Sequence, residues 1–152
     1  MNHLQLHRFN GTERFAIGSA KCFTVGHGDD FTLWFEIEAV ADGAQQCSDT
    51  AEHPATPNAE VGIYVTEFHI NEFLGREFYH AGTANDNEDS CKSLFYYYEH
   101  QPLRNNHLKV LSQSGDRKFR ILWTARTQDV NYYDGSKPDA QFEVECDFDV
   151  RP

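Results

Sequence analysis

The stretch Gln141-Phe142-Glu143-Val144-Glu145-Cys146-Asp147-Phe148-Asp149-Val150 decides the fold class, because apolar and polar residues alternate through all of it. Successive side chains of an extended strand point to opposite faces of a sheet. One face of this stretch is therefore apolar, and the other carries four carboxylates. The pattern predicts a half-buried β-strand with one solvated face.

The same alternation recurs at 31–39 and at 117–127, and weaker strand signals occur at 4–9, 14–25, 60–70, 75–80, 91–98 and 107–112. Only two short helical turns are expected, at 71–74 and 103–111. Eight or nine short strands without intervening helices imply antiparallel pairing. We therefore expect residues 1–152 to form a single all-β domain, an antiparallel two-sheet β-sandwich of the jelly-roll or Ig-like kind.

Charge predicts one pair of neighbouring strands. The polar side of the run at 117–127 carries Lys118, Arg120 and Arg126, whereas the polar side of 143–149 carries only acids. Opposite charges on adjacent strands stabilise a sheet, and acids facing acids repel. We expect these two strands to be neighbours, joined by the loop at 128–140.

The overall charge excludes several classes of partner. Thirteen Lys and Arg residues against 24 Asp and Glu residues give a formal net charge of −11 over 152 residues. Such a chain repels nucleic acid and lacks a polybasic anchor for anionic membranes. It contains no apolar run of 18 residues, and its first eight residues lack the pattern of a secretory signal. We expect a cytoplasmic protein without nucleic-acid or membrane partners.

The four cysteines, Cys22, Cys47, Cys91 and Cys146, are widely spaced and contain no C-x-x-C pair. A zinc ribbon and a thioredoxin-type site are therefore excluded. A chain of this length does not need disulfides for stability, so free thiols are favoured over disulfide bonds.

Two loops stand out by composition. The segment at about 40–59 is rich in Pro, Gly and small polar residues, and it predicts a long flexible loop. The segment at 84–90 is acidic, and Asp86, Glu88 and Asp89 are candidate calcium ligands. Asp29, Asp30 and Asp134 join them only if the fold brings these residues to the same end. The EF-hand spacing is absent, and an ordinary solvated turn is the alternative.

A third loop, at 130–138, carries Tyr132, Tyr133 and Asp134. Flat amphipathic rings beside polar groups suit stacking on a sugar or on a protein surface. The alternative is that the tyrosines pack their own loop onto the end of the sandwich. We treat these three residues as candidate ligand contacts.

Aromatic residues also occur where outward-facing positions are expected. Trp34 lies on the polar side of its strand, and in the run Phe95–Tyr98 one pair of rings must point outward. We take Trp34 and Tyr97 as a candidate contact surface for a protein partner or for self-association. The alternative is that a loop covers these rings.

Histidines and acids suggest one metal site. If the runs at 60–70 and 75–80 form a hairpin, Glu67, His69 and His80 converge as a set that suits a divalent transition metal. Ordinary surface histidines are the alternative. The chain has neither H-E-x-x-H nor G-x-S-x-G, and it has no P-loop.

These observations favour a non-enzymatic binding or protein-interaction module without a cofactor. The first alternative is a sandwich that binds a sugar or calcium through its end loops. The second is a metal-dependent enzyme centred on Glu67, His69 and His80, with a transition metal as cofactor.

Overall fold

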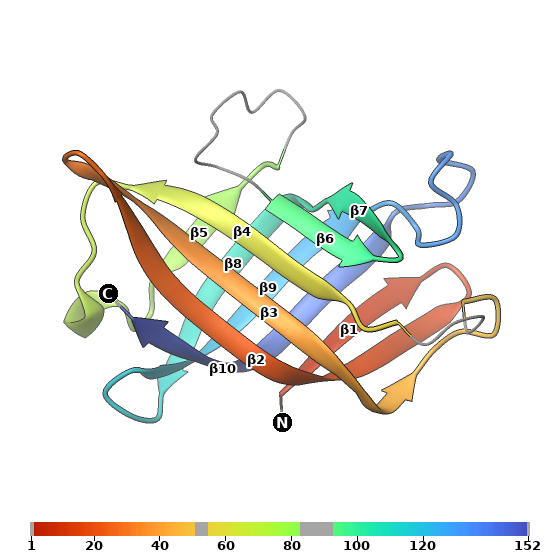
Figure 1. The fold of residues 1–152 in the computed structure, drawn as a ribbon, viewed down its shortest axis with the longest axis horizontal. Helices are drawn as coiled ribbons and strands as arrows, with labels where there is room; N and C mark the ends of the chain where they lie inside the picture. Colours follow the sequence, from red (N-terminus) through yellow and green to blue (C-terminus); the bar gives the residue numbers. More distant parts are fainter. Residues whose placement is uncertain (1, 51–54, 83–92, 152) are drawn as a thin grey trace.

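The computed structural model describes residues 2–50, 55–82 and 93–151, and within them the chain is all-β (Figure 1). The only helical segment there is the 3-10 turn η1 (Ile70–Glu72). Ten strands make up the rest of the regular structure: β1 (His3–Arg8), β2 (Gly11–His27), β3 (Asp30–Gln45), β4 (Asn58–Val65), β5 (Glu77–His80), β6 (Ser93–Tyr97), β7 (Glu99–Pro102), β8 (Arg104–Gln113), β9 (Lys118–Thr127) and β10 (Ala140–Arg151).

The strands form one continuous sheet in the order β5-β8-β9-β10-β1-β2-β3-β4-β6-β7. Neighbours are antiparallel, except for a short parallel pairing of β10 with β2. The all-β antiparallel prediction is confirmed, but the structure has one ten-stranded sheet in place of two sheets with eight or nine strands. The reason is β1, which pairs with β10 along one edge and with β2 along the other.

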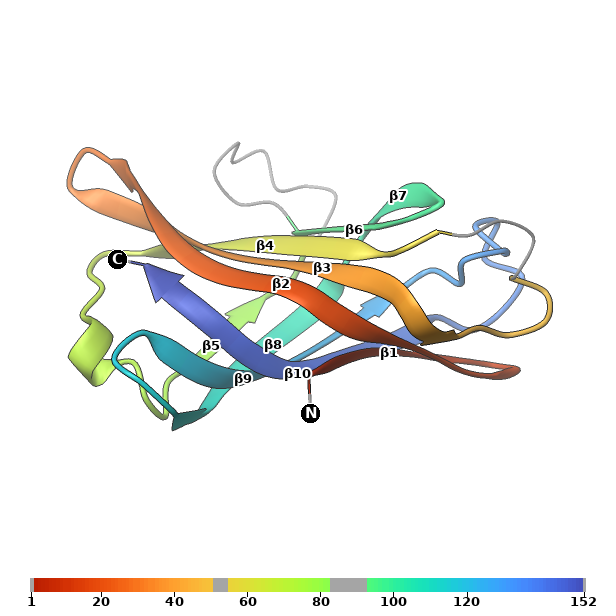
Figure 2. The same ribbon diagram turned by 60° about the horizontal axis from the view of Figure 1, so that its bottom comes forward.

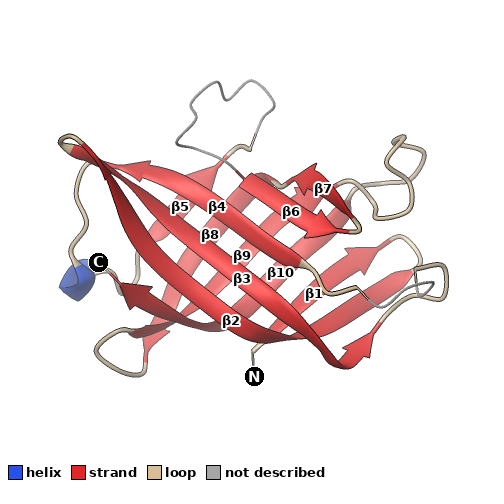
Figure 3. Ribbon diagram, viewed as in Figure 1, coloured by secondary structure: helices blue, strands red, loops and turns tan. Residues whose placement is uncertain are grey.

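The sheet curls so that β2, β3, β4 and β6 lie over β8, β9 and β10, and the core fills the space between them (Figure 2). Phe35 of β3 meets Phe148 of β10 at 6.0 Å between ring centroids, and Phe95 of β6 meets Phe142 of β10 at 5.4 Å. Figure 3 shows that the connecting loops gather at the two ends of this curled sheet. Loops at such ends are the usual place for binding groups.

The predicted pairing of the basic and acidic strands is confirmed. In the register of β9 and β10, Arg120 lies opposite Asp147, and Lys118 lies opposite Asp149. Arg120 Nη2 lies 2.8 Å from Glu145 Oε2, and its Nη1 lies 3.6 Å from Asp147 Oδ1. Cross-strand ion pairs therefore help to set which strand adjoins β10.

Three local predictions differ from the structure. The loop expected at 40–59 is shorter, because β3 continues to Gln45 and β4 begins at Asn58. The helical turn expected at 103–111 is strand β8. The hairpin of 60–70 with 75–80 does not form, since β4 pairs with β3 and β6 while β5 pairs with β8. Cys22, Cys47 and Cys146 are free thiols, as expected, and Cys91 lies outside the described residues.

Asn106 connects the two ends of the curled sheet, where β8 and β6 share no strand pairing. Its Nδ2 donates to Ser93 Oγ at 2.7 Å and to the Leu103 carbonyl at 2.9 Å. Its Oδ1 accepts the indole N–H of Trp123 at 2.9 Å. All of these groups except the carbonyl are side chains of buried residues. This amide therefore joins β6 to β8 and β9 inside the core, beside a backbone hydrogen bond of 3.2 Å from the Leu103 N–H to the Ser93 carbonyl.

Candidate functional site

The site begins with an arginine that points into the protein. Leu4, Leu6 and Arg8 occupy the inward positions of β1, and the side chain of Arg8 is 0% exposed. The tight turn at Phe9 and Asn10 then leads directly into β2, where Arg8 is paired with Gly11. A charge in this position needs compensating partners, because burying an isolated ion costs several kcal/mol.

Three carboxylates surround the Arg8 guanidinium, and we call these four residues the Arg8 cluster. Arg8 Nε and Nη2 donate to the two oxygens of Asp129 at 3.0 and 2.8 Å. Nη1 and Nη2 donate to Asp49 at 2.8 and 2.9 Å, and Nη1 also donates to Glu13 at 2.7 Å. The cluster therefore ties β1 and β2 to the segment at 46–50 and to the loop at 128–139.

Neutral donors complete the hydrogen bonding of Glu13, whose side chain is 0% exposed. Tyr97 Oη donates to one carboxylate oxygen at 2.6 Å, and Thr50 Oγ1 donates to the other at 2.6 Å. Gln46 in turn donates to Tyr97 Oη. A buried network with every member bonded is rigid, and losing one member leaves a buried polar group without a partner.

These contacts fix the protonation states. Hydrogen bonds from Arg8 lower the pKa of Asp49 to about 2, so this carboxyl is ionised at neutral pH. Burial alone lowers the pKa of Arg8, but its bonds to Asp129, Asp49 and Glu13 outweigh burial and raise that pKa overall. Burial, followed by the bond to Glu13, raises the pKa of Tyr97 well above its usual range.

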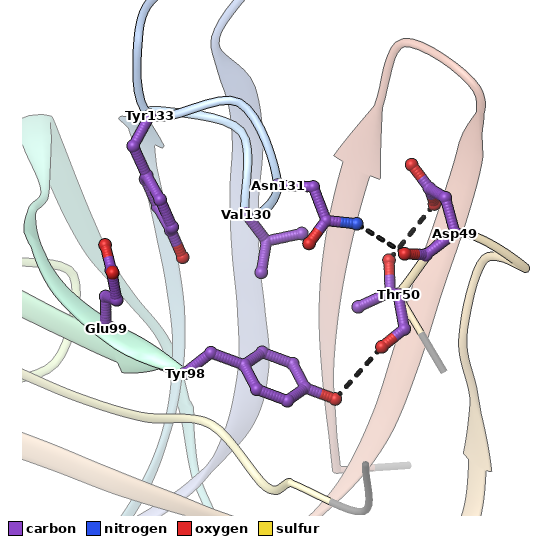
Figure 4. A pocket seen from close by; sticks show the side chains of 7 residues that line it. All are labelled: Asp49, Thr50, Tyr98, Glu99, Val130, Asn131 and Tyr133. Carbon is purple, nitrogen blue, oxygen red and sulfur yellow. Dashed lines mark hydrogen bonds between the residues drawn. The ribbon is translucent and has the colours of Figure 1, made fainter. Parts of the chain in front are cut away.

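A pocket of about 430 Å³ opens beside the Arg8 cluster (Figure 4). The turn between β6 and β7, the segment at 46–50 and the loop at 128–139 supply its walls, which consist of Asp49, Thr50, Tyr98, Glu99, Val130, Asn131 and Tyr133. Asn131 Nδ2 donates to the Asp49 carbonyl at 2.6 Å, across 82 positions of sequence. We call this cavity the end-loop pocket.

Two tyrosines of the end-loop pocket are held by hydrogen bonds to backbone carbonyls. Tyr98 Oη donates to the carbonyl of Thr50 at 3.1 Å, and Tyr133 Oη donates to the carbonyl of Tyr97 at 3.0 Å. Burial, with the nearby charges of Glu99 and Asp129, raises the pKa of Tyr133 to about 12. The Tyr133 phenol is therefore neutral at physiological pH.

Tyr98 also has an unusual backbone, with φ of 66°. This left-handed conformation is unfavourable for a large side chain by about 1–2 kcal/mol. It occurs here because Tyr98 is the one residue between the paired Tyr97 and Glu99. Strain of this kind persists where surrounding contacts enforce it, and it concentrates at functional sites.

The structure separates the three tyrosine-loop candidates. Tyr133 lines the end-loop pocket. Tyr132 instead packs edge-on against Phe9, at 5.5 Å between ring centroids, and Lys137 Nζ lies over both rings. Asp134 is exposed and accepts the backbone N–H of Ser136 at 3.0 Å, so it shapes its own turn. Of the three residues, only Tyr133 belongs to the pocket.

The expected outer surface of Trp34 and Tyr97 does not form, because Tyr97 is an inward residue of β6 and is 1% exposed. The ring that points outward beside it is Tyr96. Trp34 lies on the outer face, where a Cβ at Gly62 would be 2.9 Å from its ring. The Trp34 indole covers the backbone of β4 at Gly62, where there is no side chain. The ring therefore has a structural role.

Of the metal candidates Glu67, His69 and His80, the structure brings together Glu67 and His69 but does not group all three. His69 Nε2 lies 3.6 Å from Glu67, while His80 Nδ1 accepts the backbone N–H of Gly82 at 3.1 Å. Among the described residues, no three His, Cys, Asp or Glu side chains are grouped to hold a metal ion. Asp86, Glu88 and Asp89 lie outside the described part of the chain. The turn that carries Asp29 and Asp30 is at the opposite end of the sheet from the loop of Asp134 (Figure 1).

Sequence reasoning did not select the Arg8 cluster or Tyr98. A signal for Arg8 is present, since it continues the inward alternation of Leu4 and Leu6, and Glu13 does the same before Phe15. A charged residue at the next inward position of a strand predicts a buried ion pair. Asp49 and Asp129 have no comparable signal, because both lie in loops.

Comparisons with protein-family models, curated proteins and solved structures give no match. Within the described residues, the chain has no helix of the length and apolar character needed to cross a membrane.

Proposed function

We propose that this protein is a non-enzymatic binding module and that the end-loop pocket is its ligand site. The observation that carries this proposal is the anchoring of both pocket loops by the buried Arg8. In a preorganised pocket, ligand binding does not carry the entropic cost of ordering the pocket walls. Its volume of about 430 Å³ lies within the range of small-molecule sites.

The chemistry of the pocket walls supports binding over catalysis. The seven lining residues include no His and no Cys. The hydroxyl of Thr50 donates to Glu13, and both oxygens of Asp49 accept from Arg8. The pKa of Tyr133, at about 12, is far from neutral. A general acid or base works best with a pKa near the working pH, and none of these three groups meets that condition.

A small polar organic group, of which a sugar is one kind, fits the end-loop pocket better than a calcium ion does. Tyr133 supplies an aromatic wall, and Asn131 supplies an amide of the kind that orients polar ligands. Contact with a protein partner or a second copy through Trp34 is less well supported, since its ring covers Gly62.

The proposal is tested by NMR titration of 15N-labelled protein with a mixture of neutral sugars, alkyl amines and carboxylates. We expect the amide signals of Thr50, Glu99 and Asn131 to shift together. Tyr133→Ala should abolish these shifts, whereas Tyr79→Ala, which removes an exposed ring on β5, should leave them unchanged. Shifts that occur only elsewhere, or that survive Tyr133→Ala, contradict the proposal.

A further inference from the structure

We infer that the end-loop pocket binds the alkylammonium group of an organic cation, an inference that rests on the proposed function and specifies its ligand. The juxtaposition that carries it is a pocket lined by two tyrosines and two carboxylates, without a basic residue among its seven lining residues. The charge, the aromatic walls and the size of the pocket point to this class independently.

The charge around the pocket is negative. Asp49 lines the pocket and is ionised, and the Arg8 cluster below it sets three carboxylates against one guanidinium. Glu99 adds another, exposed carboxylate to the pocket wall. A site with this excess repels anions and attracts cations, as does the whole chain with its net charge of −11.

Aromatic walls suit an organic cation. Ammonium groups are attracted to the faces of aromatic rings, and Tyr98 and Tyr133 both line the pocket (Figure 4). The neighbouring part of the same loop already binds an ammonium in this way. Lys137 Nζ lies 4.9 Å from the ring centroid of Phe9 and 5.4 Å from that of Tyr132.

A metal ion suits this pocket less well. Calcium requires six to eight converging oxygens, but both oxygens of Asp49 already accept hydrogen bonds from Arg8. A volume of about 430 Å³ also exceeds what a single ion fills. A neutral sugar fills such a volume, but it gains no electrostatic attraction from the carboxylates of Asp49 and Glu99. A molecule with a trimethylammonium or lysine-type head group both occupies this volume and is attracted to the carboxylates.

An alkylammonium group has two sources, a free amine and the side chain of a lysine in another protein. Two matched pairs of probes distinguish them in an NMR titration of the full chain. The first pair is choline and its neutral isostere 3,3-dimethylbutan-1-ol. The second pair is Nα-acetyl-lysine N-methylamide and the same compound acetylated at Nε.

We expect a charged member to shift the amides of Thr50, Glu99 and Asn131 with an affinity about tenfold above that of its neutral partner. Choline responding more strongly assigns the pocket to free amines, and the lysine compound responding more strongly assigns it to protein side chains. Glu99→Gln should remove most of the preference for charge. Glu67→Gln, which neutralises an exposed acid outside the pocket, should leave it intact.

Two other outcomes overturn the inference, and they differ in what they mean for the proposed function. If the neutral probes bind at the same residues as tightly as the charged ones, the pocket binds ligands but does not select for charge. If neither pair shifts these residues, the inference fails, and the proposed pocket function fails with it only if the neutral sugars of the first titration also leave these residues unshifted.

Discussion

Arg8 and Asp129 lie 121 positions apart in sequence, and two hydrogen bonds of 3.0 and 2.8 Å join them with both side chains 0% exposed. This ion pair connects the end of β1 to the loop that carries Asn131 and Tyr133. The end-loop pocket therefore depends on a contact made beneath it. Stability and ligand binding should respond together when this contact is lost.

Arg8→Met should destabilise the protein by about 3–5 kcal/mol, because it leaves Glu13 and Asp129 buried without their counter-charge. The measurement is the free energy of unfolding in urea. Arg104→Met is the control, since Arg104 pairs with Asp139 at 2.9 Å near the surface and should cost at most about 1 kcal/mol. Equal losses for the two variants would show that the Arg8 cluster contributes no more than a surface pair.

Acid should weaken the protein through Asp49. Its pKa is about 2 in the folded state against an ordinary 3.8, so its stabilising contribution is complete above about pH 4 and is lost as pH falls towards 2. Asp49→Asn should remove this part of the pH dependence and lower stability at neutral pH. Unfolding in urea at a series of pH values between 2 and 7 measures both effects, with the exposed Asp42→Asn as control. An unchanged acid slope in Asp49→Asn would contradict this account.

Alternation in the sequence predicted the strands and one strand pairing, because burial on one face imposes a period of two. The charges of Arg120 and the acids of β10 were enough to identify neighbouring strands. The continuity of the sheet was not predictable in this way. It depends on β1 pairing along both edges, which is a property of the whole fold.

The candidate site was predictable only in part. Tyr133 was identified because adjacent tyrosines in a turn-rich loop are conspicuous, and it does line the pocket. The sequence prediction placed Tyr97 on the outer face, but Tyr97 is buried. Four consecutive aromatic residues do not show which of them point inward, because apolar and polar residues do not alternate among them. Asp49 and Asp129 come together through loops, where local periodicity carries no information.

Removing the amide of Asn106 should weaken the contact of β6 with β8 and β9, although the backbone hydrogen bond from Leu103 to Ser93 remains. Asn106→Ala takes away a donor to Ser93 and an acceptor for Trp123, both buried, and the expected loss is about 2–4 kcal/mol. Urea unfolding measures it, and hydrogen exchange should show faster opening of β6 than of β10. Asn58→Ala, at an exposed position on β4, should change stability by less than about 0.5 kcal/mol. A similar effect of both substitutions would show that the Asn106 side chain does not stabilise the contact of β6 with β8 and β9.

Substitutions of Tyr98 can separate the effect of backbone strain on stability from the effect of the aromatic ring on ligand binding. Its φ of 66° is open to glycine but unfavourable for alanine, so Tyr98→Gly should be more stable than Tyr98→Ala by about 1–2 kcal/mol. Both variants remove the ring that lines the end-loop pocket, and with it the bond to the Thr50 carbonyl. Urea unfolding should therefore distinguish the stabilities of the two variants, while NMR titration should show the same loss of ligand binding in each.

Gly and Ala variants of equal stability would mean that the turn relaxes when the ring is removed. The left-handed backbone of Tyr98 would then be imposed by the contacts of the tyrosine ring. Retained binding in either variant would exclude the Tyr98 ring from the ligand site.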